Sequence, residues 1–296
     1  MYYDQNTTVF LDGKWIAAGE AKADLYNQTM HYGNGVFEGI RAYQNADGCN
    51  IFKAKEHFER LQYSATKMHI GLPYSVEELI HISYELLDKN DLTNAYIRPL
   101  VYLGANMSLM PTDEVHVFMA AWQWEKYLGD TPLRVIVSSY QRPNPKSCHV
   151  EAKVVGHYTN SILATTEAKK LGYDEALLLD MHGNVAEGSG ANFFYEKEGI
   201  LYTPPAGNIL PGITRATIME LAKDLSIHVV EMHFTIEEVY GADNAFFVGT
   251  ATEVAPIESV NGETFKGSWE ESAGHSLYLM YRQKVQYNEY QGLTIV

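Results

Sequence analysis

The residues whose types could do chemistry lie mainly in the second half of the chain, in five short segments. One segment holds a lysine, Lys153, another holds a carboxylate, Glu187, and a third is the run PGIT before an expected helix. Each has an ordinary structural interpretation when taken alone, because a lysine or glutamate beside a turn is usually a solvated charge. Their joint spacing therefore carries the information. The segments are AKVVGHY (152–158), EGSGANFF (187–194), LYT (201–203), LPGITR (210–215) and GTATE (249–253).

Several other chemistries lack the motifs that they need. The sequence has no GxGxxG that follows a strand and opens a helix, and no GxxxxGK[ST], so dinucleotide and P-loop sites are not predicted. It has no HExxH or CxxC, and its 11 histidines are scattered, so we expect no metal. The GSG at 188–190 lacks the five-residue GxSxG turn of serine hydrolases.

Composition narrows the class of protein further. A chain of 296 residues with 46% hydrophobic and 20% charged residues predicts a globular protein, with two domains favoured over one. The net charge of −15 disfavours nucleic acid as a partner. We expect no signal peptide and no membrane span, because no run of about 18 apolar residues occurs. The two cysteines, Cys49 and Cys148, have no metal-type spacing and fit the reducing cytoplasm.

Local patterns predict α+β structure in the first half. Asp12-Gly13 between two apolar runs predicts a hairpin, and NADG between VFEGIRAY and NIF predicts another. Helical spacing predicts a helix over 55–68, and Ser75 with Glu78 forms a capping box for a second helix. β-branched and aromatic runs predict strands at AYIRPLVYL, VHVFMAAW and LRVIVSS.

The second half is also predicted to be α+β. Helices are expected at about 159–171, after PGITR, from Thr235 and from about 270. Between the halves, YLGDTP places a glycine, an aspartate and a proline between two strand-like runs. We therefore expect a small N-terminal α+β domain at 1–127, a linker at 128–132 and a large C-terminal domain at 133–296. The expected strands of the second half are EALLLD, NFFYE, ILYT, HVVEM and NAFFVGT.

The spaced set resembles the fold-type IV pyridoxal-phosphate (PLP) enzymes, the class IV aminotransferases. The family's order runs unbroken through Glu187, Ser189, Asn192, Phe193-Phe194, Leu201, Thr203, Leu210, Gly212-Ile213 and Arg215. HYGNGVFEGIRAY, HFERL, AYIRP and AWQWEKYLG resemble segments of branched-chain amino acid aminotransferases. The resemblance spans about residues 9–255. It implies two α+β domains with the active site at their interface, and PLP bound mainly by the C-terminal domain.

The resemblance implies which residues bind the cofactor. Lys153 is the catalytic residue that holds the cofactor's aldehyde and then moves the proton of the substrate Cα. Glu187 keeps the pyridine nitrogen protonated, and Tyr158 donates to the ring O3′. The phosphate suits the N–H groups of a helix N-terminus together with a bidentate cation. Its implied partners are Arg60, Ile213, Thr214 and Thr250, and Leu210 packs on the ring.

The resemblance also implies a pocket for two kinds of substrate. It must take an aliphatic side chain and also glutamate, the common amino donor. Arg98 is expected to meet the side-chain carboxylate of glutamate, while Tyr96 and the N–H groups of Thr250-Ala251 hold the α-carboxylate. The walls are expected to be Phe37, Gly39 and Tyr127, with Tyr32 reaching in from a neighbouring subunit, so at least a homodimer is expected.

The expected function is ping-pong transfer of an amino group between leucine, isoleucine or valine and 2-oxoglutarate. Three alternatives keep the fold: a D-amino acid transaminase, an (R)-amine transaminase and an aminodeoxychorismate lyase. A non-catalytic PLP-binding module is a fourth. The chain departs from the family at the β-branched Val154-Val155, at His157, where asparagine is commoner, and in its short interdomain segment. These departures bear on the substrate range.

Overall fold

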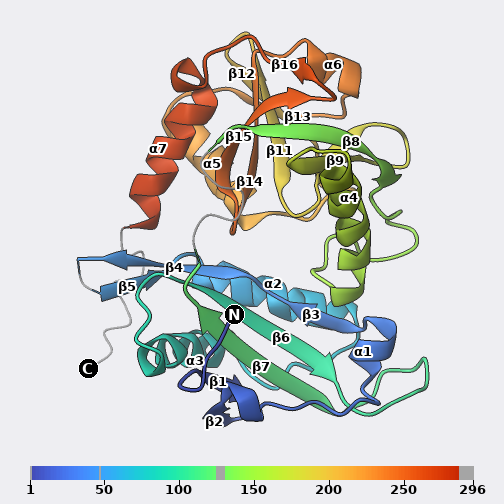
Figure 1. Ribbon diagram of the computed structural model, residues 1–296, viewed down its shortest axis with the longest axis vertical. Coiled ribbons are helices and arrows are strands. Elements are labelled where there is room, and N and C mark those ends of the chain that lie inside the picture. Colours follow the sequence, from blue (N-terminus) through green and yellow to red (C-terminus); the bar gives the residue numbers. More distant parts are fainter. Residues whose placement is uncertain (1, 47, 125–130, 287–296) are drawn as a thin grey trace. The chain divides into compact units, whose positions relative to one another are not determined.

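The computed structural model describes residues 2–46, 48–124 and 131–286 (Figure 1). The chain divides into two compact units. Unit 1 holds the described residues up to Trp124, the segment Ala152–Gly156 and residues 285–286. Unit 2 holds residues 131–151 and His157–Lys284. Most of the expected linker, 128–132, lies outside the described residues, so the expected domain bounds stay a prediction.

Unit 1 is built on one antiparallel sheet. Within its described residues seven strands pair in the order β2-β1-β7-β6-β4-β5, and β3 also pairs with β6. The turn between β1 and β2 is the predicted hairpin, since Asp12 and Gly13 both have positive φ, of 48° and 80°. The strands are β1 (Thr8–Leu11), β2 (Lys14–Ala17), β3 (Gly35–Phe37), β4 (Ile40–Asn45), β5 (Gly48–Ile51), β6 (Ala95–Leu103) and β7 (Val115–Trp122).

Two amphipathic helices supply the core of unit 1. α2 (Ala54–Lys67) and α3 (Val76–Lys89) bury their apolar faces against the sheet, while the short α1 (Gln28–Tyr32) precedes β3. Phe58 and Leu61 of α2 and Leu79 of α3 are fully buried in one cluster with Ile97 of β6. The opposite face of β6 is therefore the one left for polar and aromatic side chains, because alternate residues of a strand point to opposite faces.

Unit 2 is built on a second sheet. Its described strands pair in the order β10-β9-β8-β15-β14-β11-β12-β13, with β16 on β15, and an additional β10–β11 pairing joins two distant strands of this path. Most pairs are antiparallel, but β8–β9, β8–β15 and β12–β13 are parallel. The strands are β8 (Leu133–Gln141), β9 (Glu175–Leu179), β10 (Val185–Gly188), β11 (Asn192–Lys197), β12 (Ile200–Thr203), β13 (Val229–Glu231), β14 (Asn244–Gly249), β15 (Glu253–Val260) and β16 (Glu263–Thr264).

The helices of unit 2 begin where the sequence patterns place them. α4 (Tyr158–Lys170) and α5 (Ile213–Asp224) match the expected helices closely, and α6 (Ile236–Tyr240) follows Thr235. α7 (Ala273–Val285) is the expected last helix. The core of the unit packs around Phe193, Phe234 and Phe247. Single 3-10 turns complete the elements: η1 (Ala18–Glu20), η2 (Val155–His157) and η3 (Trp269–Glu271).

The α+β prediction is confirmed, and one expected strand is broken. VFEGIRAY forms two strands, β3 and β4, which are interrupted at Glu38 and Gly39. Glu38 carries a fully buried carboxylate, and the missing side chain of Gly39 leaves room for another residue of the sheet. None of the helices in the described ranges is long and apolar enough to cross a membrane.

The capping box before α3 gives a stability test. The Ser75 side chain accepts from the Glu78 N–H at 3.2 Å, and Glu78 accepts in return from the Ser75 N–H at 2.7 Å. Ser75→Ala should lower the free energy of unfolding by about 1 kcal/mol, because one N–H of the first turn loses its partner. Urea unfolding measures this. Ser147→Ala, at an exposed serine of a loop, is the control, and an equal loss in both variants would contradict the capping role.

Candidate active site

Lys153 belongs to unit 1, although it follows β8 of unit 2 in the sequence. Its N–H donates to the Ser64 Oγ of α2 at 2.9 Å, and its carbonyl accepts from the Phe37 N–H at 3.2 Å. The next residue, Val154, forms a β-bridge with Val36 and is 2% exposed. The Lys153 Nζ lies 5.1 Å from the centre of the Phe37 ring. The β-branched residue after the lysine thus has a structural reason, because it completes the core of unit 1.

Arg60, the expected phosphate-binding residue, lies on α2 beside a buried carboxylate. Its Nε donates to Glu38 Oε1 at 2.6 Å and its Nη2 donates to Glu38 Oε2 at 2.9 Å. The His57 Nδ1 is 2.8 Å from Glu38 Oε2. Burial by itself would raise the pKa of Glu38, but Arg60 and His57 outweigh it and hold the pKa well below the ordinary value. Burial lowers the pKa of His57, against the opposing effect of Glu38.

Aromatic rings surround Arg98 on the sheet face opposite the helices. Its Cζ lies 4.8 Å from the ring centre of Phe37, 5.3 Å from that of Tyr96 and 6.0 Å from that of Trp122. Tyr96 pairs with Trp122 in the sheet, and the Arg98 Nη2 donates to the Tyr96 hydroxyl at 3.3 Å. These rings form an apolar wall around the Arg98 guanidinium, which suits both an alkyl group and a carboxylate.

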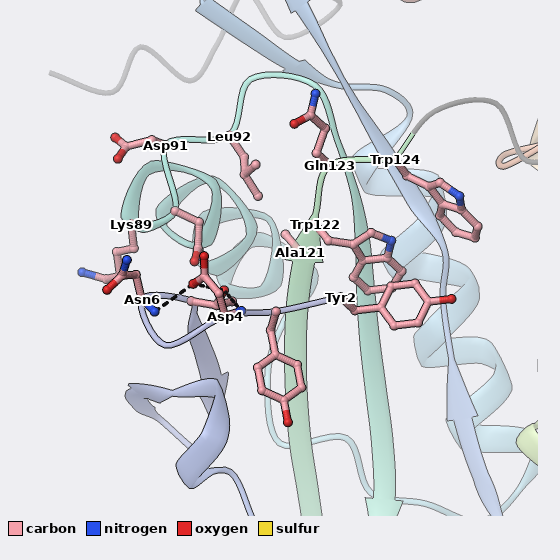
Figure 2. A pocket seen from close by; sticks show the side chains of 13 residues that line it. Tyr2, Asp4, Asn6, Lys89, Asp91, Leu92, Ala121, Trp122, Gln123 and Trp124 are labelled. Atoms are coloured by element: carbon pink, nitrogen blue, oxygen red, sulfur yellow. Dashed lines mark hydrogen bonds between the residues drawn. The ribbon is translucent and has the colours of Figure 1, made fainter.

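Gly39 fits this wall because it has no side chain. A Cβ at this position would lie 1.8 Å from the Tyr96 hydroxyl, so any larger residue would displace the Tyr96 ring. Trp122 of this wall also lines an open cavity of about 880 Å³. Figure 2 shows the Tyr2 ring next to Trp122 there, with their centres 5.5 Å apart. The cavity is lined by Tyr2, Tyr3, Asp4, Asn6, Thr7, Lys89, Asn90, Asp91, Leu92, Ala121, Trp122, Gln123 and Trp124.

Glu187 is the buried carboxylate of unit 2. It lies near the end of β10, is 5% exposed, and forms an ion pair with Arg142, whose Nε lies 2.8 Å from Oε1. The Asn192 Nδ2 donates to Oε2 at 3.0 Å, and the Leu210 N–H donates to Oε1 at 3.2 Å. A guanidinium and two N–H donors thus surround this carboxylate.

The N-terminus of α5 has a glycine that lets another side chain approach its backbone closely. Gly212 is the N-cap residue and supplies no side-chain cap to the N–H groups that follow, among them those of Ile213 and Thr214. A Cβ at Gly212 would lie 1.9 Å from Asn192 Oδ1, which explains the glycine. Arg215, in contrast, is buried and bonds to Thr203, to the Pro204 carbonyl and to Glu231, so its role is structural.

The other expected site residues are placed as follows. Tyr158 is the first residue of α4 and is partly buried, and Thr250 and Ala251 lie in the turn between β14 and β15. Tyr32 on α1 is 48% exposed and donates to the Met107 carbonyl at 3.2 Å. Tyr127 lies outside the described residues.

The structure thus groups the expected residues within each unit. Unit 1 brings Lys153 and Arg98 to the ring of Phe37, and Tyr96 contacts Arg98 and lies against Gly39. Unit 2 brings Leu210 to Glu187. Four residues that hold these groups in place have no role in the motifs above: Glu38, His57, Ser64 and Arg142. Two of them could have been found from the sequence, because His57 and Ser64 are polar residues on the buried face of α2.

Comparison with known proteins fits this geometry. Residues 35–260 match the family Amino-transferase class IV. The chain is 43% identical over 265 residues to the branched-chain-amino-acid aminotransferase of Pseudomonas aeruginosa, an alignment that covers 88% of this chain and 86% of that protein. The chain therefore belongs to the class IV aminotransferases, which confirms the resemblance.

Solved structures point to one group within this class. A branched-chain aminotransferase from Thermoproteus uzoniensis with norvaline superposes with a TM-score of 0.92 at 39% identity, covering 96% of both chains. The branched-chain amino acid aminotransferase from Thermobaculum terrenum in its PLP-form superposes with a TM-score of 0.90 at 32% identity, covering 96% of this chain and 95% of that chain. All three of these similar proteins are thus branched-chain aminotransferases.

The buried Glu38 and His57 predict a pH dependence of stability. Both have a folded-state pKa below the unfolded value, so acidification protonates the unfolded chain first and lowers the free energy of unfolding. The His57 part should be lost as the pH falls below about 6.5, and the Glu38 part below about 4.3. Urea midpoints at pH 7, 5.5 and 4 measure the loss.

Two variants isolate the His57 part of this loss. His57→Gln should make the fall between pH 7 and 5.5 smaller, because the variant has no imidazole to protonate. His81→Gln, at an exposed histidine of α3, should leave the fall as it is. The same slope in all three proteins would show that His57 does not contribute.

Proposed function

We propose that this chain is a PLP-dependent aminotransferase that moves the amino group between the branched-chain L-amino acids leucine, isoleucine and valine and 2-oxoglutarate. The observation that carries the proposal is the Phe37 ring, which has the Lys153 amine on it at 5.1 Å and the Arg98 guanidinium at 4.8 Å. An amine and a guanidinium thus lie beside the same aromatic ring. Family membership and the relatives' names support the same conclusion.

The residues present fit PLP. The donor set combines an amine, an arginine on a helix, a buried carboxylate with its own donors, and the N-terminus of α5, whose N-cap is a glycine. When bound, PLP supplies the electron sink that permits loss of the substrate Cα proton. We assign its phosphate to Arg60, Ile213, Thr214 and Thr250, its pyridine nitrogen to Glu187, its O3′ to Tyr158 and its ring face to Leu210.

The chain's own groups then have distinct tasks. Lys153 Nζ is held at the substrate Cα by its fixed backbone and moves the proton there. The Glu187 carboxylate, which contacts Arg142 and Asn192, would hold the proton of the pyridine nitrogen. Tyr96 and the N–H groups of Thr250-Ala251 bind the α-carboxylate. The apolar wall excludes water from an alkyl side chain, and Arg98 binds the distal carboxylate of glutamate.

We further propose a cytoplasmic homodimer, with Tyr127 as a wall of the pocket and Tyr32 reaching a neighbouring subunit. Exposed apolar side chains on α1 and on the loop after β6 support a subunit contact at this place, since such patches mark interaction sites. They are Met30 (59% exposed), Tyr32 (48%), Met107 (51%), Leu109 (84%) and Met110 (73%).

A donor panel tests the function. With PLP and 2-oxoglutarate, the protein should form glutamate from L-leucine, L-isoleucine and L-valine, and Lys153→Ala should abolish turnover because no amine is left to move the Cα proton. Glutamate formation measured by coupled assay reports each donor. Faster turnover with D-amino acids or (R)-amines would favour those transaminases instead. Binding of PLP without turnover of any donor would favour the non-catalytic module.

The aromatic surroundings of Arg98 predict a split between substrates. Arg98→Leu removes a charge-assisted contact to the distal carboxylate, at a cost of roughly 2–5 kcal/mol. The kcat/KM for glutamate should fall by about 1.5 to 3.5 powers of ten, and that for leucine should change far less. Stopped-flow half-reactions with each donor measure both values. Arg134→Leu, at an exposed ion pair, is the control, and equal losses for the two donors would contradict dual recognition.

A further inference from the structure

A carboxylate with no role in the proposed function is the most completely buried charged group beside the site of unit 1. Glu38 is 0% exposed and lies where β3 ends and β4 begins. Its own N–H donates to the Pro99 carbonyl at 3.0 Å, and the Gly39 N–H donates to Oε2 at 3.2 Å. Backbone hydrogen bonds therefore hold both the main chain and the carboxylate of Glu38 in place.

The partners of this carboxylate come from one face of α2. His57 and Arg60 are three residues apart, and Ser64 follows four residues later, so all three side chains share a helix face. The first two hold Glu38, and the third accepts the N–H of Lys153. One helix face thus joins the β3–β4 break to the backbone of the lysine.

The contact with Arg60 uses one particular edge of the guanidinium. Glu38 takes the Nε–H and one Nη2–H, the pair that forms the side edge of the planar group. The end edge, made of Nη1 and the second N–H of Nη2, is geometrically separate. One arginine can therefore hold a carboxylate and a phosphate oxygen together, and the carboxylate sets the plane in which the phosphate is met.

The charge of Glu38 works against an anion on Arg60, whereas its geometry works for it. A carboxylate at 2.6 Å offsets much of the positive charge that would attract a phosphate. Burying an arginine and a glutamate together is also weak evidence for a stabilising role. The pair therefore serves to orient the Arg60 guanidinium, because a bidentate contact removes the rotational freedom of this long side chain.

We propose that Glu38, supported by His57, is a positioning residue that fixes the Arg60 guanidinium for the cofactor phosphate. This inference rests on the proposed function, in which Arg60 binds that phosphate. Glu38 touches neither cofactor nor substrate. It acts by holding Arg60 in one orientation, as the partners of a metal-binding side chain hold that ligand.

Two variants of the full chain separate geometry from charge. Glu38→Asp keeps the charge but is one methylene shorter, so it cannot reach both nitrogens of Arg60 from the same backbone. Glu38→Gln keeps the length but removes the charge and one of the two acceptor oxygens. The readout is phosphate discrimination, the ratio of the dissociation constants of pyridoxal and PLP, measured by absorbance on cofactor-stripped protein. A merely structural change weakens both ligands alike and leaves this ratio unmoved.

The positioning role predicts a fall in both variants, because neither can accept from both nitrogens of Arg60. Glu38→Asp should lower phosphate discrimination by about 10- to 100-fold, the range seen when the partner of a ligating side chain is lost. Glu38→Gln should also lower it, since its amide offers one acceptor oxygen where the carboxylate offers two. Unchanged discrimination in Glu38→Asp overturns the inference, and a fall confined to Glu38→Gln would make the charge itself the requirement.

A third variant distinguishes failure of this inference from failure of the phosphate assignment. Arg60→Ala should lower discrimination at least as far as Glu38→Asp. If Arg60→Ala leaves discrimination unchanged, Arg60 does not bind the phosphate and the assignment in the proposed function is wrong. If Arg60→Ala lowers it while Glu38→Asp does not, the assignment stands and only the positioning role of Glu38 is overturned.

Discussion

A buried carboxylate must be paired, because moving a charge out of water costs several kcal/mol unless a cation and hydrogen-bond donors replace the solvent. Both units meet this constraint beside the residues that we place in the active site. Glu38 is held by Arg60 in unit 1, and Glu187 is held by Arg142 in unit 2. Each pair ties a strand end to a residue far away in the sequence. The local backbone around both carboxylates is therefore set by long-range contacts and not by strand propensity.

In unit 1 the helix α2 connects the buried carboxylate to the segment that carries Lys153. α2 carries the arginine that meets Glu38 and the serine that accepts the N–H of Lys153. A rotation of the helix by even part of a turn would move the proposed phosphate contact and the lysine backbone at the same time. The core side chains Phe58 and Leu61, both fully buried, lie next to these residues on the helix and resist such a rotation.

How far the sequence predicts this protein depends on the range of the interactions. The Asp12-Gly13 hairpin and the Ser75 capping box were predictable because their signals lie within four residues. The family resemblance supplied Lys153, Glu187 and Arg98, whose types alone indicate only solvated charges. The partners of Arg60 and Lys153 were not predictable, because Glu38 lies 22 residues from Arg60 and Ser64 lies 89 residues from Lys153. The placement of Ala152–Gly156 in unit 1 was not predictable either, because it also depends on contacts between residues far apart in the sequence.

That placement has a consequence for how the chain is made. Ala152 and Val154 belong to the core of unit 1, and Val154 bridges Val36. A ribosome delivers these residues only after β8 of unit 2 has emerged, so the N-terminal part cannot finish folding when its own strands are complete. Until then the core positions that receive the segment present apolar surface to solvent. The core cluster of unit 1 is thus completed by a piece of chain that arrives late, and the same piece brings in Lys153.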